Sequence, residues 1–125
     1  MKLSYSKNEK LKSKKQIDQL FSKGRSISEF PLRLVYLPCK HSDNEIMKAS
    51  VSVSKRNFKK AVKRNRIKRL LREAYRLNKG SFFNNITTQY ALMILYIGSD
   101  EPSFQQVESS MKKLLNKFKN TISER

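Results

Sequence analysis

The sequence predicts an α+β sandwich in which three helices pack on a small mixed sheet of about four strands. Three observations support this class. Apolar residues recur at helical spacing in three stretches, the runs between them have the alternating or continuous apolar pattern of strands, and no internal repeat or Gly/Ser-rich linker divides the 125 residues. The length suits one domain. We therefore expect a single domain over residues 1–125, with an ordered core of about 5–120.

The first helix is predicted over about residues 14–23. Ser13 begins a capping-box pattern, Ile17 and Phe21 lie on one apolar face, and Gly24 is expected to end the helix.

Two strands are predicted next. The chain is rich in β-forming residues from Phe30 to Leu37, and Pro38 closes this run. Residues 47–53 alternate apolar and polar side chains, and a polar loop joins the two strands, which we expect to be antiparallel. A further short strand over residues 25–29 is weakly indicated.

The longest helix is predicted from about Phe58 to Asn78, with Ser54 or Asn57 as its N-cap and Gly80 as its C-cap.

The last two elements are a strand and a helix. Residues 90–97 form a continuous apolar run, which is typical of a central strand. Pro102 and Ser103 then open a helix with apolar residues at helical spacing.

The charge of the chain is large and segmental. There are 28 Lys and Arg against 10 Asp and Glu, a formal net charge of +18. Residues 55–79 hold twelve of these bases and one acid, and residues 1–25 hold eight bases and two acids. Because the densest run lies mid-chain among apolar residues, it indicates a folded cationic surface rather than a disordered tail. Such a surface requires a polyanionic partner.

Several classes of protein are disfavoured. The longest apolar run, over residues 91–97, is too short to cross a bilayer, and the first residues lack the apolar region of a signal peptide. Cys39 is the only cysteine, which fits a reducing compartment and excludes a disulfide framework or a structural zinc site. We expect a soluble cytoplasmic protein.

The predicted long helix has one apolar and one cationic face. At 100° per residue, Ile67, Leu71 and Ala74 share a face. The opposite face holds Asn65, Lys68, Arg69, Arg72 and Arg76. Like charges four residues apart destabilise an isolated helix, so folding alone does not explain this face. Arginine donors suit phosphate oxygens, which favours a nucleic-acid partner over a merely solvated face.

RNA is favoured over specific DNA recognition. Strands, not a short packed helix, precede the cationic helix, and no zinc-finger or basic-zipper spacing is present. Phe21, Phe30 and Tyr36 are aromatic candidates for stacking on single-stranded bases. Packing in the core is the alternative for each of the three.

Residues 61–76, with the sequence AVKRNRIKRLLREAYR, closely resemble the signature of the bacterial ribonuclease P protein component. Residues 11–24, 50–56 and 91–97 are similar to flanking parts of that family. The resemblance implies an α/β sandwich with a left-handed crossover around the signature helix. It also implies a subunit of an endoribonuclease ribonucleoprotein that removes the 5′ leader of precursor tRNA.

The resemblance further implies that the RNA subunit of such an enzyme carries the catalytic centre and binds Mg²⁺. The protein contacts this RNA and holds the single-stranded leader in a cleft between sheet and helices. The expected partners are therefore ribonuclease P RNA and precursor tRNA, with no membrane and no protein partner. The charged segment around the first helix is expected to border the same RNA.

The resemblance also assigns residues. The signature supplies six RNA-binding residues, and two neighbouring cations complete the set. They are Arg64, Asn65, Arg66, Lys68, Arg69 and Arg72, with Lys60 and Arg76. Ile17, Phe21 and Val35 correspond to the lining of the leader cleft, where Ile17 and Val35 stand in place of aromatic residues found in some members.

Catalysis by protein side chains is not expected. The only histidine, His41, lies in a predicted polar loop, and the acids are too scattered for a metal-ion clamp. No catalytic or metal-binding residue is predicted. The alternative function is a non-catalytic basic RNA-binding protein of ribosomal or chaperone type, and a weaker one is a nonspecific DNA-compacting protein.

Overall fold

The computed structural model describes residue 5 and residues 7–123, and it confirms the α+β class. Its elements follow in the order η1 (Lys7–Glu9), α1 (Lys14–Lys23), β1 (Arg25–Glu29), β2 (Leu32–Pro38), β3 (Met47–Val53), α2 (Ala61–Phe82), β4 (Tyr90–Tyr96) and α3 (Phe104–Ser123). The weakly indicated first strand is present as β1. Within the described residues, no helix is both long enough and apolar enough to cross a membrane.

The four strands form one mixed sheet in the order β1-β2-β4-β3. β4 pairs antiparallel with β2 and parallel with β3. β2 and β3 therefore run antiparallel, as predicted, but they are not neighbours in the sheet. β4 is buried along nearly its whole length and takes the central position that its apolar sequence predicts, which separates the two strands.

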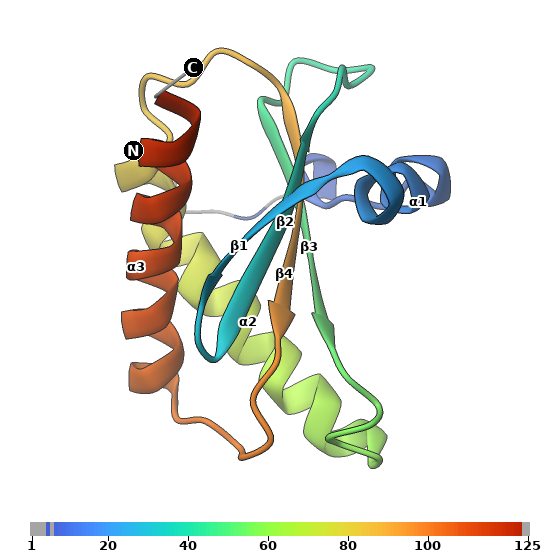
Figure 1. The fold of residues 1–125 in the computed structure, drawn as a ribbon, viewed down its shortest axis with the longest axis vertical. Coiled ribbons are helices and arrows are strands. Elements are labelled where there is room, and N and C mark those ends of the chain that lie inside the picture. The colour runs from blue at the N-terminus through green and yellow to red at the C-terminus, as the bar shows by residue number, and fades with distance from the viewer. Residues whose placement is uncertain (1–4, 6, 124–125) are drawn as a thin grey trace.

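The connection from β3 through α2 to β4 is left-handed. In Figure 1, β3 lies to the right of β4, both arrows point down, and α2 passes behind the sheet. Nearly all crossovers between parallel strands of one sheet are right-handed, so this connection is an exception. It agrees with what the family resemblance implies.

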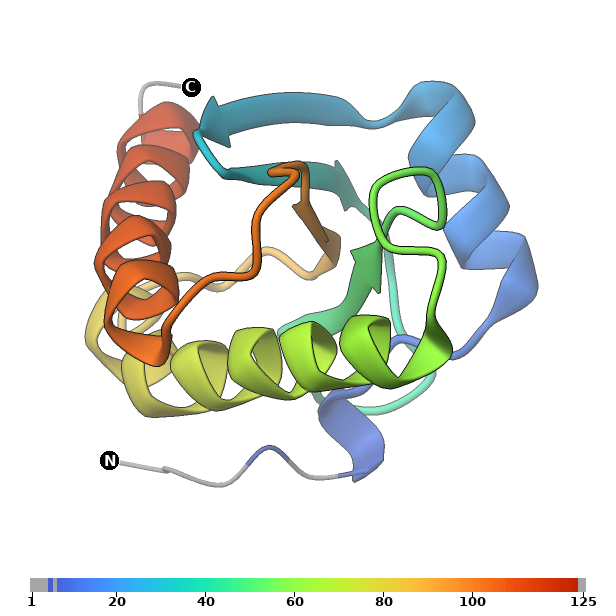
Figure 2. The same ribbon diagram turned by 90° about the horizontal axis from the view of Figure 1, so that it is seen from below.

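Helices cover both faces of the sheet. α2 and α3 pack on one face, and α1 lies across the other (Figures 1 and 2). The larger core lies under α2 and α3 and includes Leu34, Leu92 and Ile94. A smaller cluster lies under α1, where Leu20 packs with Val35 and other side chains of the second face.

α1 begins and ends as predicted. Ser13 is the N-cap, and its Oγ accepts a hydrogen bond from the backbone N–H of Gln16 at 3.3 Å. Gly24 is the C-cap and donates its N–H to the carbonyl oxygen of Leu20 at 2.8 Å. A Cβ at Gly24 would collide with this same oxygen and approach Val35 Cγ1 to 3.0 Å. Close approach, rather than a positive φ, explains glycine here, since its φ is −70°.

β2 starts two residues later than predicted. Phe30 and Pro31 form the turn from β1, joined by a cis peptide bond, and the Pro31 carbonyl accepts a hydrogen bond from Ile97 at 2.8 Å. Pro38 is the last residue of β2 rather than the first residue after it.

Both predicted ends of the long helix are wrong. α2 begins at Ala61, and its N-cap residue Lys60 makes no side-chain cap. Ser54 instead accepts a hydrogen bond from Arg56 within the preceding turn, and the Asn57 side chain donates to the carbonyl of Gly98.

α2 also continues through Gly80 to Phe82. Phe82 and Phe83 both pack against the larger core, and this tertiary packing offsets the helix penalty of about 1 kcal/mol for one glycine.

α3 has the complete capping box that Ser103 suggests. The backbone N–H of Gln106 donates to Ser103 Oγ at 3.2 Å, and the backbone N–H of Ser103 donates to Gln106 Oε1 at 3.0 Å.

Candidate nucleic-acid interface

α2 turns its cationic face outward, as the helical projection predicts. Ile67, Leu71 and Ala74 are buried in the core. Of the eight predicted RNA-binding residues, five are exposed and three are partly buried. The exposed ones are Lys60, Asn65, Arg66, Arg69 and Arg72, and the partly buried ones are Arg64, Lys68 and Arg76.

Some of these cations already have partners within the protein. Arg64 Nη1 donates to the carbonyl oxygens of Phe58 and Lys59, both at 2.8 Å, and so anchors the start of α2 where no side-chain cap exists. Arg66 lies 3.7 Å from a carboxylate oxygen of Glu101. Arg64 therefore has a structural role that the charge pattern did not indicate.

Arg76 is paired with Glu73 one turn earlier. Its Nε donates to Glu73 Oε2 at 3.2 Å. The hydrogen bond from Arg76 lowers the pKa of the Glu73 carboxyl below its usual value, and the same contact raises the pKa of Arg76. Among the described residues, no ion pair involves Lys68, Arg69 or Arg72. These three side chains, which we call the open triad, have neither a carboxylate nor a carbonyl partner among the described residues, whereas Arg64 donates to two carbonyls.

The predicted cleft residues divide into two groups. Val35 is buried under α1, and Ile17 is partly buried in the same cluster. Phe21, on the same helix, is 54% exposed. The structure therefore brings Ile17 and Val35 together as packing residues and leaves about half of Phe21 accessible to a ligand.

The other aromatic candidates also differ. Tyr36 is buried, with its ring edge-on to Phe118 at a centroid distance of 5.1 Å, so it packs in the core. Phe30 is 75% exposed at the turn between β1 and β2, away from α1.

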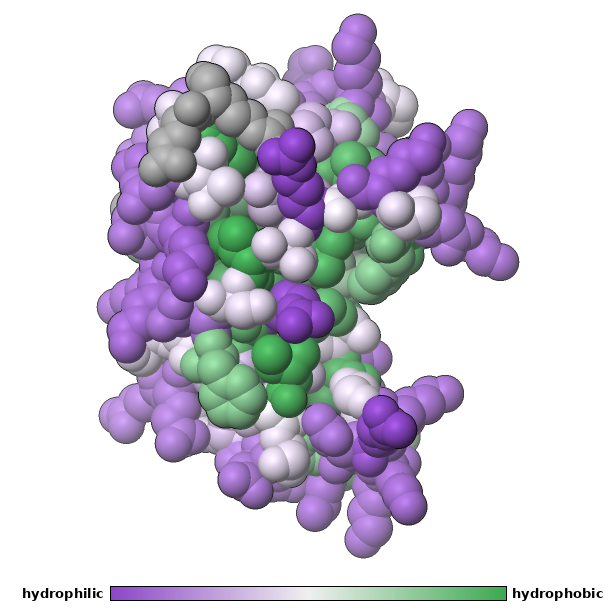
Figure 3. Space-filling view, in the orientation of Figure 1, coloured by the Kyte–Doolittle hydropathy of each residue, from purple (hydrophilic) through white to green (hydrophobic). Residues whose placement is uncertain are grey.

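The surface is hollowed between the part over α1 and the part over the start of α2 (Figure 3). A small hollow of about 230 Å³ is lined by Lys10 and Lys12 from the N-terminal segment, Ser50 of β3 and Arg72 of the open triad. The N-terminal lysines were not among the predicted site residues. The excess of bases in residues 1–25 was the only sequence signal for them.

His41 is held in a structural network. Its Nε2 lies 2.8 Å from the carbonyl oxygen of Tyr90, and because a carbonyl oxygen can only accept, Nε2 is the donor. Nδ1 lies 3.4 Å from Gln16 Nε2 and accepts from it. Its backbone N–H donates to Gln89 Oε1. These contacts tie the loop after β2 to α1 and β4.

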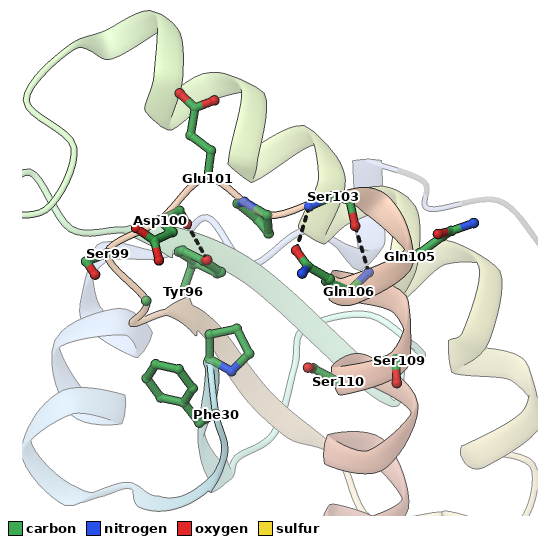
Figure 4. Close-up of a pocket in the computed structure, with 13 residues that line it drawn as sticks. Phe30, Tyr96, Ser99, Asp100, Glu101, Ser103, Gln105, Gln106, Ser109 and Ser110 are labelled. Atoms are coloured by element: carbon green, nitrogen blue, oxygen red, sulfur yellow. Dashed lines mark hydrogen bonds between the residues drawn. The ribbon is translucent and has the colours of Figure 1, made fainter.

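A cavity of about 720 Å³ lies beside the loop after β4 (Figure 4). Phe30, the loop after β4 and the first turns of α3 line it, and Asp100 and Glu101 are its charged residues. The Tyr96 hydroxyl donates to the Asp100 carbonyl at 2.6 Å, and burial raises the pKa of this phenol. None of the described lining residues is Lys or Arg, but Glu101, which lines the cavity, pairs with Lys63 and Arg66 near the start of α2, so the cavity adjoins the cationic surface.

In the described part of the chain, no three or more His, Cys, Asp or Glu side chains are grouped so that they could hold a metal ion. The side chains of this interface instead offer cationic donors, one amide and an exposed ring. Such groups bind phosphate oxygens and stack on bases.

Comparisons with known proteins agree with this arrangement. The Ribonuclease P family model matches residues 5–119. A ribonuclease P protein component from Porphyromonas gingivalis is 39% identical over 121 residues, which cover 94% of this chain and 88% of the relative. One from Clostridium botulinum is 36% identical over 112 residues, which cover 89% and 95%.

Solved structures show the same fold. The ribonuclease P protein of Staphylococcus aureus has a TM-score of 0.69 at 20% identity, with 88% of this chain and 94% of that one covered. That of Thermotoga maritima has a TM-score of 0.66 at 20% identity, with 87% and 96% covered.

Proposed function

The chain belongs to the ribonuclease P protein family, whose name implies ribonuclease P RNA as its partner, and from this premise we propose how its surface is used. The open triad of α2 binds phosphates of that RNA, and the α1 side of the sheet holds the single-stranded 5′ leader of precursor tRNA. The protein thereby positions the substrate for endonucleolytic removal of the leader.

The open triad is the observation that carries the first part. Lys68, Arg69 and Arg72 lie outward on one helix with no acidic partner among the described residues, opposite a fully buried face. Adjacent cations on a helix repel each other, and Glu73 is already engaged by Arg76. A line of phosphates supplies the missing counter-charge, and arginine offers paired donors to each phosphate.

The exposed ring of Phe21 supports the second part. A base can stack on a ring that remains accessible, and stacking tolerates any base sequence. This suits a leader, which differs from one precursor tRNA to another. Ile17 and Val35 then support α1 from below instead of contacting bases.

We place the chemistry in the RNA. His41 is engaged by Gln16 and by a main-chain carbonyl. Mg²⁺, in this proposal, is bound mainly through RNA phosphates, and the protein contributes by binding and orienting. The proposed site of action is the cytoplasm, where precursor tRNA is made in bacteria.

Reconstitution tests the proposal. The full chain is mixed with a bacterial ribonuclease P RNA transcript at low Mg²⁺, and release of the 5′ leader from precursor tRNA is measured. We expect the wild-type chain to stimulate cleavage and the variant Lys68→Ala/Arg69→Ala/Arg72→Ala to lose most of this stimulation.

The matched control is Lys112→Ala/Lys113→Ala/Lys119→Ala, which removes the same charge from exposed positions of α3. It is expected to stimulate like the wild type. Equal losses in both variants would show that net charge matters and the position of the triad does not. Absence of stimulation by the wild-type chain would contradict the proposed function as a whole.

A further inference from the structure

A second cationic hollow lies beside the start of α1 and has no lining residue from α2 among the described residues. It has a volume of about 500 Å³ and is lined by five lysines from three parts of the chain. Lys7, Lys10 and Lys12 come from the N-terminal segment, Lys40 from the loop after β2, and Lys48 from β3. None of the described residues that line it is acidic. We call it the lysine pocket.

Most of this charge is not neutralised within the protein. Lys48 is paired with Asp43 at 2.9 Å. Within the described residues, Lys7, Lys12 and Lys40 form no ion pair, and Lys10 lies over the ring of Tyr5 at 5.6 Å from its centroid. Ammonium groups gathered around one hollow repel each other, so the pocket is most stable when an anion occupies it.

The walls of the pocket are fixed by hydrogen bonds. Gln16 Nε2 donates to the Lys40 carbonyl at 3.4 Å and so joins α1 to the loop after β2. The ring of His41 bonds to the Tyr90 carbonyl and holds the same loop to β4. On the other wall, the N–H of Leu11 donates to the Ala49 carbonyl at 2.9 Å. The lysines thus project from a formed site, which reduces the cost of ordering on binding.

The N-terminal end of α1 adds a positive electrostatic potential to that of the lysines. Ser13, the N-cap of the helix, is part of the pocket lining, and the first turn of α1 contains no acidic residue. The first amides of a helix lack intrahelical acceptors, and its N-terminal end carries partial positive charge. Together with the lysines, this end of α1 favours an anion in the pocket.

The lysine pocket is continuous with α2. The smaller hollow beside it shares Lys10 and Lys12 and is bordered by Arg72 of the open triad. A cationic path therefore leads from α2 across the outer side of β3 to the start of α1. A ligand with regularly repeated phosphates can follow such a path.

We propose that the lysine pocket binds backbone phosphates of ribonuclease P RNA and extends the contact made by the open triad. This inference rests on the proposed function, because it assigns the RNA subunit, and not the leader, to both surfaces. The continuity through Arg72 is the reason for that choice.

The test removes one lysine from each wall of the pocket in the full chain. The variant Lys12→Ala/Lys40→Ala and the matched control Lys112→Ala/Lys113→Ala lose the same charge, and all four positions are exposed. Affinity for a ribonuclease P RNA transcript is measured over a range of salt concentrations. For two lost phosphate contacts, the slope of log affinity against log salt should become shallower by roughly 1.4–1.8, with roughly a 5- to 8-fold loss per lysine at 0.1 M salt.

The control is expected to keep the wild-type slope. Circular dichroism and the melting temperature establish that each variant is folded, and Lys12→Gln/Lys40→Gln replaces the alanine pair if that pair does not fold. Unchanged slope and affinity in the pocket variant would overturn the inference while leaving the proposed function intact, provided that the wild-type chain binds the RNA and stimulates cleavage.

A second experiment distinguishes a contact with the RNA subunit from a contact with the leader of precursor tRNA. The assembled holoenzyme is tested with precursor tRNAs that carry a short or a long leader. Normal affinity for the RNA subunit combined with a loss that appears only with the long leader would overturn the assignment to the RNA subunit. Loss of affinity for the subunit, independent of leader length, would support it.

Discussion

Replacing Phe21 with alanine tests whether its exposed ring binds the leader or supports the fold. About half of this side chain is already accessible, since its exposed fraction is 54%. The covered part is on the order of 100 Å², so its loss lowers the free energy of unfolding by about 2.5 kcal/mol or less. The better helix propensity of alanine returns about 0.5 kcal/mol of this.

Phe21→Ala is also expected to weaken binding of the leader. A base stacked on an aromatic ring contributes roughly 1–3 kcal/mol, which corresponds to roughly a 5- to 150-fold loss of affinity. The assay compares binding of precursor tRNA and of mature tRNA to the holoenzyme assembled with wild-type or Phe21→Ala protein. Only the tRNA that carries a leader should lose affinity.

Phe30→Ala is the matched control, because Phe30 is 75% exposed at the turn between β1 and β2. It removes a ring that is more accessible than Phe21 and lies away from α1, and it should leave both affinities unchanged. The reasoning about Phe21 is refuted by an equal loss for the two tRNAs, or by the same leader-specific loss in the Phe30 variant.

Three other predictions concern the open triad, two glycines and a buried phenol. Arg69→Ala or Arg72→Ala should each make the salt dependence of RNA binding shallower by roughly 0.7–0.9, and a slope equal to that of the wild type would contradict a phosphate contact. Gly24→Ala should lower the free energy of unfolding, measured in urea titrations, by about 1–3 kcal/mol, because the added Cβ would meet a carbonyl oxygen one turn earlier. Gly80→Ala should raise it by about 0.5–1 kcal/mol, because Gly80 lies inside α2 without a positive φ. Burial raises the pKa of Tyr5 to about 12, so the folded protein keeps a proton that the unfolded chain loses near pH 10. The free energy of unfolding should therefore fall as the pH rises from about 10 toward 12. Tyr5→Phe should make this fall less steep when unfolding is measured across that range.

Local patterns in the sequence were sufficient for most elements. The capping pairs that start α1 and α3 are three residues apart, and the apolar run of β4 is continuous, so each is visible in a short window. The outward face of α2 follows from its helical period alone. The order of the strands does not, because the insertion of β4 between β2 and β3 depends on where α2 packs.

Errors at element ends arose where distant contacts override local preference. Gly80 stops many helices, but two phenylalanines after it gain contacts with the core. At the start of α2, Arg64 reaches back to main-chain carbonyls of the preceding turn, a contact that no local capping pattern indicates.

The lysine pocket could not be predicted for a similar reason. Its walls come from the N-terminal segment, the loop after β2 and β3, and no spacing within one segment relates them. The buried ion pair between Glu9 and Lys79 likewise joins residues 70 positions apart.

The outer side of β3 has a consequence for how copies of this protein behave toward one another. An edge strand offers unpaired main-chain groups to which a strand of another molecule can add, and this is a common start of aggregation. Here Lys10 forms a bridge with Ala49, and the next residue donates a hydrogen bond to the same position, so part of that edge is occupied from within the chain. The lysines on either side make the approach of an identical molecule unfavourable. The N-terminal segment thus keeps the sheet from growing by self-association, in addition to any contact that it makes with RNA.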